Sequence, residues 1–370
     1  MVGVALVAIV PASAPAAPPP SVTAAALLVQ NGVTGETLLR RDARRRVPIA
    51  SITKLMTVLV TLERSGLDEV VTVAPAALGD GGSSIFLRAG ERLTVRDLVR
   101  AALIQSANDA ANALAVHVGR GSERRFIRLM NARASSLGLA DTHFVRPDGL
   151  DTPGHVSSAR DVTVLARVVM RRPVVRAIVA ERTATIAGGR TLNTWNDLLE
   201  SFPGVVGVKT GHTSDAGWSQ VAAARRGGIL IYATLLGSPS RGRRNADLAS
   251  LLRFGFTRYR AVPVISTARV YARVRTEYDR PSVPLRAARS LVRTVRVDRG
   301  LVERVIAPEW VDLPVRKGAR LGEVRVFDSR RRLIGRRPLV AAVTVRRPDV
   351  RGRIRWYADR ALDTARGWLP

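Results

Sequence analysis

Cysteine is absent from this chain of 370 residues. Its absence excludes disulfide bonds, zinc sites built on thiolates and a cysteine nucleophile. Histidine is scarce as well, because the chain holds only His117, His143, His155 and His212, and none of them has a partner at metal-ligand spacing. The sequence therefore predicts no metal site and no cofactor.

Aromatic residues make up only 5% of the chain, so Val, Leu, Ile and Ala must build the core. Lysine is rarer still: among 59 basic residues, only Lys54, Lys209 and Lys317 are lysines, and the net charge is +29. An arginine stays charged in a protein, whereas a buried lysine can lose its proton and act as a base. The three lysines are therefore the first candidates for a titrating amine.

The apolar run at the N-terminus, 1–10, is too short to cross a bilayer as a helix. A Pro- and Ala-rich stretch follows over 11–20, and the two together are typical of the apolar core and cleavage region of a signal peptide. We therefore expect 1–20 to be a signal-peptide-like segment and the protein to act outside the cytoplasm, secreted or periplasmic. Basic residues usually open such a segment and are missing here, so a start further upstream and a plain apolar N-terminus both stay open.

Residues 22–260 have the pattern of a layered α+β domain. Two apolar runs with glycines between them predict a hairpin over 24–40. Three strands separated by glycines are predicted over 205–236. Helical periodicity marks 94–118, 123–137 and 243–258.

The pattern of apolar and turn-forming residues changes in the last third of the chain. Short alternating runs broken by Pro, Gly and Asp predict a small all-β domain over 262–348. This part is strongly basic, since 261–370 holds 26 Lys and Arg against 11 Asp and Glu. The tail, 349–370, is amphipathic at helical spacing, and we expect it either to lie on a membrane surface or to pack on the β domain. Trp356 lies off its apolar stripe, which leaves both alternatives open.

The first candidate for chemistry is Ser51-Ile52-Thr53-Lys54, at the start of an apolar run with helical period. Residues three apart on a helix share a face, so the Ser51 hydroxyl and the Lys54 amine can come within hydrogen-bonding reach. Serine becomes a nucleophile when a nearby base takes its proton. An uncharged Lys54 can do so if burial and a second cation lower its pKa. Taken alone, the tetrad is more typical of a serine that caps a helix.

Two further motifs place polar side chains at a loop and at a strand end, from which they can reach a cleft. Ser106-Ala107-Asn108 lies between two helical patterns, where a hydroxyl and an amide can point from one loop into a cleft; a helix-capping loop is the alternative. Lys209-Thr210-Gly211-His212 ends an apolar strand, and an exposed turn is the alternative there. In the functional interpretation, Lys209 lowers the pKa of Lys54, Thr210 binds a carboxylate, and Gly211 leaves room for substrate.

These three motifs, in this order, are the set found in penicillin-binding proteins and class A β-lactamases. They use two of the three lysines of the chain. Over 24–260 the chain resembles the low-molecular-mass D-alanyl-D-alanine carboxypeptidases, a penicillin-binding family with a serine β-lactamase/transpeptidase-like domain. Supporting stretches are Gly82-Ser83-Ser84-Ile85-Phe86-Leu87, Asp141-Thr142-His143-Phe144 and His155-Val156-Ser157-Ser158. The family usually has Ser-Gly-Asn as its second motif, so Ala107 departs from the pattern but keeps both functional side chains.

The resemblance implies a division of labour among the motif residues. Ser51 would attack the carbonyl between the two D-alanines of a peptidoglycan stem peptide and form an acyl-enzyme, with Lys54 as its base. Ser106 and Lys209 would pass a proton to the leaving D-alanine, while Asn108 holds the substrate amide. β-Lactams are then expected to be covalent inhibitors.

The resemblance also implies how the substrate oxygens are held. The backbone N–H groups of Ser51 and His212 are similar to the family's oxyanion hole. Thr210 and Arg244 would receive the terminal carboxylate, with Arg243 as the alternative arginine.

Two other functions stay open at this point. A class A-like β-lactamase shares the motifs, but it deacylates with a glutamate on a loop between the second and third motifs. Glu123, Glu181 and Glu200 lie in that interval, and none has such a loop context. A non-catalytic wall protein that binds polyanions would explain the charge. Nucleic acid is not expected as a partner, because the arginines are spread along the chain with few aromatics between them.

Overall fold

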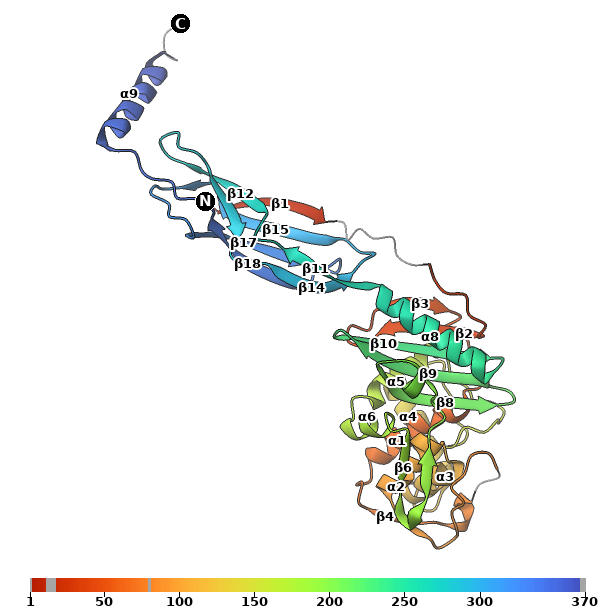
Figure 1. Cartoon of the computed structure of the whole chain (residues 1–370). Coiled ribbons are helices and arrows are strands. Elements are labelled where there is room, and N and C mark those ends of the chain that lie inside the picture. Colours follow the sequence, from red (N-terminus) through yellow and green to blue (C-terminus); the bar gives the residue numbers. More distant parts are fainter. Residues whose placement is uncertain (1, 11–17, 79–80, 367–370) are drawn as a thin grey trace. The chain divides into compact units, whose positions relative to one another are not determined.

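The computed structural model describes residues 2–10, 18–78 and 81–366. Its contacts divide the chain into two compact units (Figure 1). The first unit spans Pro18–Thr257, and the second combines the described N-terminal residues with the chain from Arg258 onward. The boundary after Thr257 lies within a few residues of the one expected from the change in sequence texture.

The first unit is built on a five-stranded antiparallel sheet in the order β3-β2-β10-β9-β8. Its strands are β2 (Ala26–Asn31), β3 (Thr37–Arg41), β8 (Val205–Thr213), β9 (Gly217–Arg226) and β10 (Ile229–Ser238). The predicted hairpin and the predicted three-strand segment thus join into one sheet, because β2 pairs with β10. In β9, four consecutive residues, 221–224, are fully buried, so both faces of the sheet must be covered.

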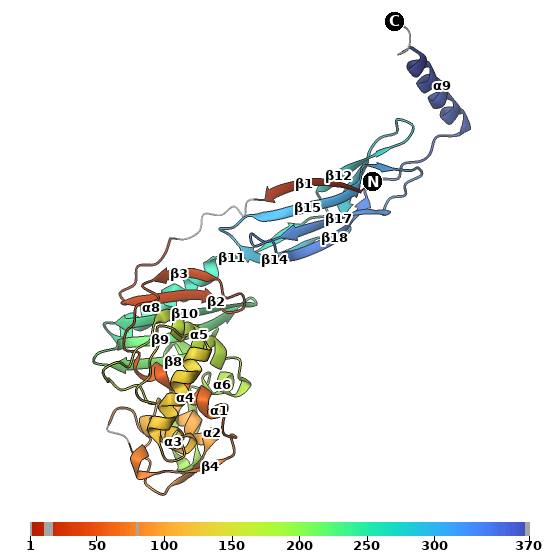
Figure 2. The ribbon, with the colours of Figure 1, turned by 180° about the vertical axis from the view of Figure 1, so that it is seen from behind.

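Helices α5 (Ala159–Val169) and α8 (Arg241–Thr257) cover opposite faces of this sheet, as Figures 1 and 2 show from the two sides. Gly255 of α8 lies against Ile231, where an added Cβ would come within 2.7 Å of that side chain. Thr163 of α5 bonds Thr234, with 2.6 Å between the hydroxyl oxygens. Residues three apart in a strand point to opposite faces, so the two helices enclose the sheet. The expected α+β class is confirmed.

The remaining helices of the first unit form a second layer beyond α5 and β8. They are α1 (Lys54–Leu62), α2 (Val95–Arg100), α3 (Asn108–Val118), α4 (Glu123–Ser136), α6 (Pro173–Ile178) and α7 (Leu198–Ser201). Two short hairpins accompany them: β4 (Val70–Thr72) with β5 (Arg92–Thr94), and β6 (Thr183–Thr185) with β7 (Thr191–Asn193).

The predicted helix over 94–118 is interrupted. After α2, one π-helical turn runs over Ala101–Gln105, Ser106 takes a left-handed conformation with φ 63°, and α3 starts at Asn108. The sequence predicted that Ser106-Ala107-Asn108 lies between two helical patterns, but apolar periodicity did not show the π-helical turn that precedes it. The interruption matters for function, since it is the point that carries the second motif.

The second unit is mainly β-structure. Its seven-stranded sheet has the order β1-β15-β17-β18-β13-β12-β16, and β11 pairs with β14 beside it. The strands are β1 (Val2–Val10), β11 (Tyr259–Ile265), β12 (Val270–Thr276), β13 (Val283–Ala287), β14 (Leu291–Arg296), β15 (Leu301–Pro308), β16 (Trp310–Val311), β17 (Arg320–Phe327) and β18 (Leu333–Ala341). The apolar N-terminal run therefore pairs with β15 in this structure. Residues 11–17 of the predicted signal-peptide-like segment lie outside the described residues, and its removal stays a prediction.

The tail forms helix α9 (Val350–Arg366). Trp356, which lies off the apolar stripe, donates a hydrogen bond to Asp279 at 2.8 Å and packs edge-on against Tyr278, with 5.2 Å between ring centroids. The stripe itself stays open, because Ile354 is 63% and Leu362 58% exposed. No helix in the described part of the chain is long and apolar enough to span a membrane.

Candidate active site

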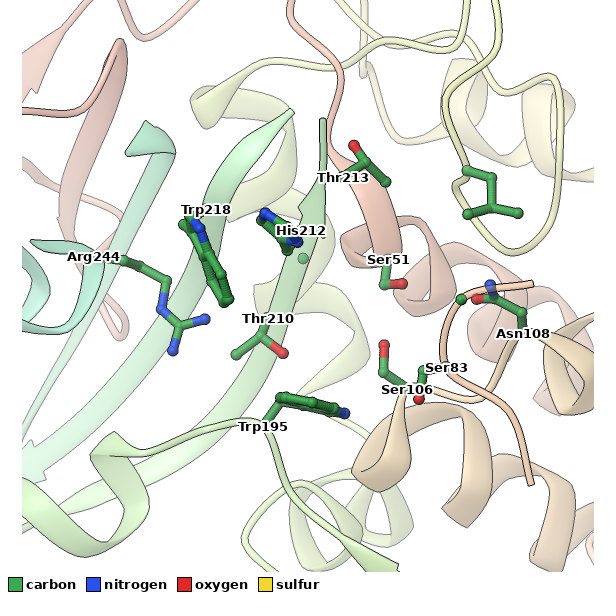
Figure 3. A pocket seen from close by; sticks show the side chains of 13 residues that line it. Ser51, Ser83, Ser106, Asn108, Trp195, Thr210, His212, Thr213, Trp218 and Arg244 are labelled. Carbon is green, nitrogen blue, oxygen red and sulfur yellow. The ribbon is translucent and has the colours of Figure 1, made fainter. Parts of the chain in front are cut away.

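A cavity of about 260 Å³ lies in the first unit, between β8 and the loops that precede α1 and α3 (Figure 3). Residues from all three motifs line it. The two motif lysines do not; they are buried beneath the lining residues. The lining residues are Ser51, Gly82, Ser83, Ser106, Asn108, Leu150, Trp195, Thr210, Gly211, His212, Thr213, Trp218 and Arg244.

Ser51 lies on a single 3-10 turn, Ala50–Thr53, that leads directly into α1. Ala50 has a left-handed φ of 48°, which turns the chain sharply before the serine. This brings the Nζ of Lys54, the first residue of α1, to 2.8 Å from the Ser51 Oγ. Neither this turn nor α1 has a side-chain N-cap. The Ser51 hydroxyl is therefore hydrogen-bonded to the Lys54 amine and does not cap a helix.

Lys54 is completely buried, and its Nζ has two further acceptors. They are the Oδ1 of Asn108 at 2.6 Å and the carbonyl oxygen of Asp148 at 2.7 Å. Burial lowers the pKa of Lys54 to about 7, against the opposing effect of the Asp148 and Asp109 carboxylates, and Arg146 lowers it further. An uncharged amine would still donate to Asn108 and Asp148, with its lone pair directed at Ser51.

Lys209 extends from β8 and is also buried. Its Nζ donates to the Ser106 Oγ at 2.8 Å and to the Thr210 carbonyl at 2.9 Å. Burial lowers its pKa well below the usual value, and the nearby charges of Lys54 and Arg244 lower it further. The expectation that Lys209 is what lowers the pKa of Lys54 needs correction, because burial is the main cause for both amines.

Asn108 joins the first motif to the cavity wall. While its Oδ1 accepts from Lys54, its Nδ2 donates to the Gly81 carbonyl at 2.9 Å. The side chain is thereby held at both ends, with one N–H of the amide left for a substrate. In this structure the Asn108 side chain orients the Lys54 amine.

The reason for glycine at 211 differs from the expected one. A Cβ there would lie 2.7 Å from the Ile49 carbonyl oxygen and 3.2 Å from the Ala50 side chain. Gly211 therefore lets β8 pack closely against the turn that holds Ser51. Beside it, His212 stacks on Trp218 with 3.9 Å between ring centroids, so its side chain forms part of the wall.

Arg244 rather than Arg243 faces the cavity. Its side chain is only 1% exposed and lines the cavity on the side of Thr210, as Figure 3 shows, whereas Arg243 is exposed to solvent. Its guanidinium carbon lies 5.6 Å from the centroid of the Trp218 ring. Burial lowers the pKa of Arg244 to about 10, so it stays positively charged at neutral pH.

Sequence reasoning missed several residues that shape the cavity. Asp109 accepts from the Ser84 hydroxyl at 2.6 Å and from the backbone N–H of Leu87 at 3.0 Å, and so anchors the loop that brings Ser83 to the cavity. Trp195 also lines the cavity, and its indole N–H donates to the Gln105 carbonyl that accepts from Ser83 as well; nothing in its local sequence indicated this. For Asp109, its place beside Asn108 was the available signal.

His155 has a structural role. Its Nε2 lies 2.7 Å from the Thr53 Oγ1, and its Nδ1 accepts from the backbone N–H of Val145 at 3.1 Å. Burial lowers the pKa of His155 to about 4, so the ring is neutral at pH 7. Its contact with Thr53 supports the turn that leads into α1. Within the described residues, no group of three or more acidic or His side chains could hold a metal ion.

Comparison with known proteins agrees with this geometry. The model of the D-alanyl-D-alanine carboxypeptidase family matches residues 12–240. Curated relatives include DacC of Escherichia coli, 32% identical over 90% of this chain and 87% of that protein. DacF of Bacillus subtilis is 30% identical over 78% of this chain and 77% of its own length.

Solved structures show the same likeness. The Streptomyces K15 DD-transpeptidase has a TM-score of 0.62 and 34% identity, covering 65% of this chain and 99% of that one. Penicillin-binding protein D2 of Listeria monocytogenes, solved in its ampicillin-bound form, has a TM-score of 0.59 and 32% identity, covering 65% of this chain and all of that one. By its motifs, its fold and these matches, the chain belongs to the D-alanyl-D-alanine carboxypeptidase family of serine peptidases.

Proposed function

We propose that this protein removes the terminal D-alanine from peptidoglycan stem peptides by way of an acyl-enzyme on Ser51. The observation that carries the proposal is the 2.8 Å contact between the Ser51 hydroxyl and a buried lysine amine whose pKa is lowered to about 7. A serine activated in this way can attack a carbonyl at neutral pH.

In the acylation step, the Ser51 oxygen adds to the carbonyl carbon between the two D-alanines, and Lys54 takes the serine proton. The amide C–N bond then breaks as the leaving nitrogen takes a proton from the Ser106 hydroxyl, and Ser106 regains one from Lys209 across the 2.8 Å contact. Lys209 therefore enters this step as an ammonium and leaves it as a neutral amine, while Lys54 ends the step protonated. One proton leaves Ser51 and one reaches the leaving amine, so the site as a whole neither gains nor loses a proton. Water then cleaves the ester and restores Ser51.

The substrate oxygens have separate binding groups in this proposal. The backbone N–H groups of Ser51 and His212 would bind the oxyanion, a contribution that is often worth about 3–4 kcal/mol of barrier. The terminal carboxylate would lie between Thr210 and Arg244, which both line the cavity. A penicillin carries a carboxylate at an equivalent place, so β-lactams would acylate Ser51 as well.

The β-lactamase alternative differs in the fate of that acyl-enzyme. None of the described residues that line the cavity is a glutamate, which is the residue class A β-lactamases use for deacylation. This supports a long-lived penicillin adduct. Prompt hydrolysis of penicillin would favour the β-lactamase alternative.

The test is covalent labelling of the full chain with a fluorescent penicillin, followed by peptide mapping. We expect one labelled peptide containing Ser51 and no label on Ser51→Ala. In parallel, a diacyl-Lys-D-Ala-D-Ala peptide should release D-alanine. Label on another residue, or the same label on the Ser51→Ala protein, would refute the mechanism.

We also propose that the protein acts outside the cytoplasm, where peptidoglycan is found. The support is the family's chemistry together with the signal-peptide-like pattern of 1–20. The exposed apolar stripe of α9, with Ile354, Tyr357 and Leu362 each more than half exposed, supports a place for this helix on a membrane surface. Anchoring there would keep the active site close to newly made wall.

A further inference from the structure

A short segment, 193–197, crosses from one wall of the active-site cavity to the other; we refer to it as the strap. At its first end, the Trp195 indole N–H donates to the carbonyl oxygen of Gln105 at 3.1 Å. The backbone N–H of Asn193 donates to the Gln105 side chain at 2.8 Å. Gln105 directly precedes Ser106, so this end of the strap is attached to the loop of the second motif.

At its other end, Asp197 makes contact with the arginine expected to bind substrate. Its Oδ2 accepts from the Arg244 Nη2 at 3.1 Å and from the Asn245 Nδ2 at 2.6 Å. Arg241 donates to both carboxylate oxygens, at 2.5 and 2.9 Å, and its guanidinium lies 5.3 Å from the centroid of the Trp195 ring. The hydrogen bonds from Arg241 lower the pKa of Asp197, which is therefore ionised at neutral pH.

These contacts leave one edge of Arg244 for a ligand. Its Nε and Nη2 both donate to the Asn245 Oδ1, at 3.0 and 2.8 Å, and Nη2 also serves Asp197. Nη1 has no hydrogen-bond partner among the described residues. The side chain lies beside Thr210 and faces the cavity, as Figure 3 shows.

The Asp197 carboxylate is not needed by its own helix. Asp197 stands at the start of α7, a position where an aspartate often caps, yet its side chain makes no capping bond there. It turns instead toward two guanidinium groups, which would face each other without an anion between them. A purely structural helix cap would not show this arrangement.

We propose that Asp197 is a positioning residue for substrate recognition, which holds the Arg244 guanidinium so that Nη1 faces the place of the substrate's C-terminal carboxylate. This rests on the proposed function of the cavity. With Asp197 between them, Arg241 and Arg244 keep a net charge of one positive unit at the site. Through Trp195 and Gln105, the strap also ties the carboxylate-binding side to the loop of Ser106.

The test compares two peptides, diacyl-Lys-D-Ala-D-Ala with a free C-terminal carboxylate and the same peptide with a C-terminal amide. In the wild-type protein, kcat/KM should strongly favour the carboxylate. Asp197→Asn should reduce this preference about 10- to 100-fold, the range expected when a charge-assisted hydrogen bond loses its alignment. The loss should fall mainly on KM for the carboxylate peptide, and the amide peptide should be cleaved as before.

Glu200→Gln is the matched control. It removes one negative charge from the same short helix, where Glu200 is exposed and pairs with Arg182 rather than Arg244. This variant should keep the full preference. An equal loss for both peptides in Asp197→Asn would mean a structural role only and would overturn the proposal, as would an unchanged preference.

Binding separates this proposal from the proposed function. The same two peptides are titrated calorimetrically into Ser51→Ala protein with and without Asp197→Asn. Selective binding of the carboxylate peptide that Asp197→Asn removes would support the positioning role, even if the wild-type protein cleaved neither peptide. Equal binding of the two peptides before Asp197 is changed would refute it.

Discussion

At the scale of single residues, burial determines the chemistry of this site. Lys54 and Lys209 are ordinary lysines in sequence, but each lies in the protein interior with a hydroxyl within 2.8 Å. Removing an ammonium group from water disfavours its charged form. Arginine could not replace either amine, because it does not lose its proton in a protein.

This argument gives a pH dependence for acylation. Lys54 must be uncharged to accept the Ser51 proton, and its pKa is about 7. The rate of labelling by a fluorescent penicillin should therefore rise from pH 5 to pH 9, with its midpoint near 7. A rate that stays constant between pH 6 and 8, in protein that circular dichroism shows to be folded, would contradict a lysine base with this pKa.

The lowered pKa of Lys54 also destabilises the folded protein. The pKa of Lys54 is about 7 when folded and near 10.5 when exposed, so the unfolded chain binds the extra proton between these values. Lys54 therefore lowers the free energy of unfolding. This destabilisation has its full size below pH 7 and decreases to zero as the pH rises toward 10.5. A functional amine is thus retained at the expense of stability.

At the scale of secondary-structure elements, the site depends on how closely β8 approaches the turn before α1. Gly211 permits this approach. In Gly211→Ala, the added methyl group would meet the Ile49 carbonyl at 2.7 Å, and backbone cannot move aside as a flexible side chain can. We expect a loss of about 1–3 kcal/mol in the free energy of unfolding and a loss of penicillin labelling of more than about tenfold.

Gly242→Ala is the control for that substitution. Gly242 lies in α8, and an added Cβ there has nothing within 4 Å. Alanine is the better helix former, so this variant should gain up to about 1 kcal/mol and label normally. Urea unfolding curves and labelling rates check both variants. Normal labelling of Gly211→Ala would show that the close approach is not required.

At the scale of the whole molecule, the first unit has its own core and holds all three motifs. The Streptomyces K15 DD-transpeptidase matches 65% of this chain while 99% of its own length is covered, so a related chain exists at about the size of this unit. We expect the isolated segment 18–257 to fold and to be labelled by penicillin within about twofold of the full chain. Failure of soluble, folded protein to label would assign part of the site to the second unit.

The tail helix makes a separate prediction at this scale. Because its apolar stripe is exposed and its other side carries arginines, the full chain should float with liposomes that contain anionic lipid. A chain ending at Pro348 keeps most of the positive charge, so it should float less than the full chain, and added salt should weaken the binding of both. Equal flotation of the two would remove the membrane proposal and leave the contacts of Trp356 as the helix's main role.

Much of this protein could be predicted from local patterns. The apolar runs over 205–236 and the glycines between them predict three strands, and three short motifs in a fixed order indicate the family. Such patterns depend only on neighbours along the chain, which is why they can be read without coordinates. The loop at Ser106 was expected, but the π-helical turn over Ala101–Gln105 could not be predicted, because apolar residues continue through it.

Tertiary structure alone decided the electrostatics and the fine fit of the site. The burial that lowers the pKa of Lys54 comes from residues far along the chain, among them Asn108 and Asp148. The contact of Asp197 with Arg244 joins positions 47 residues apart. Desolvation and close packing are properties of the assembled interior, and no segment of the sequence carries them by itself.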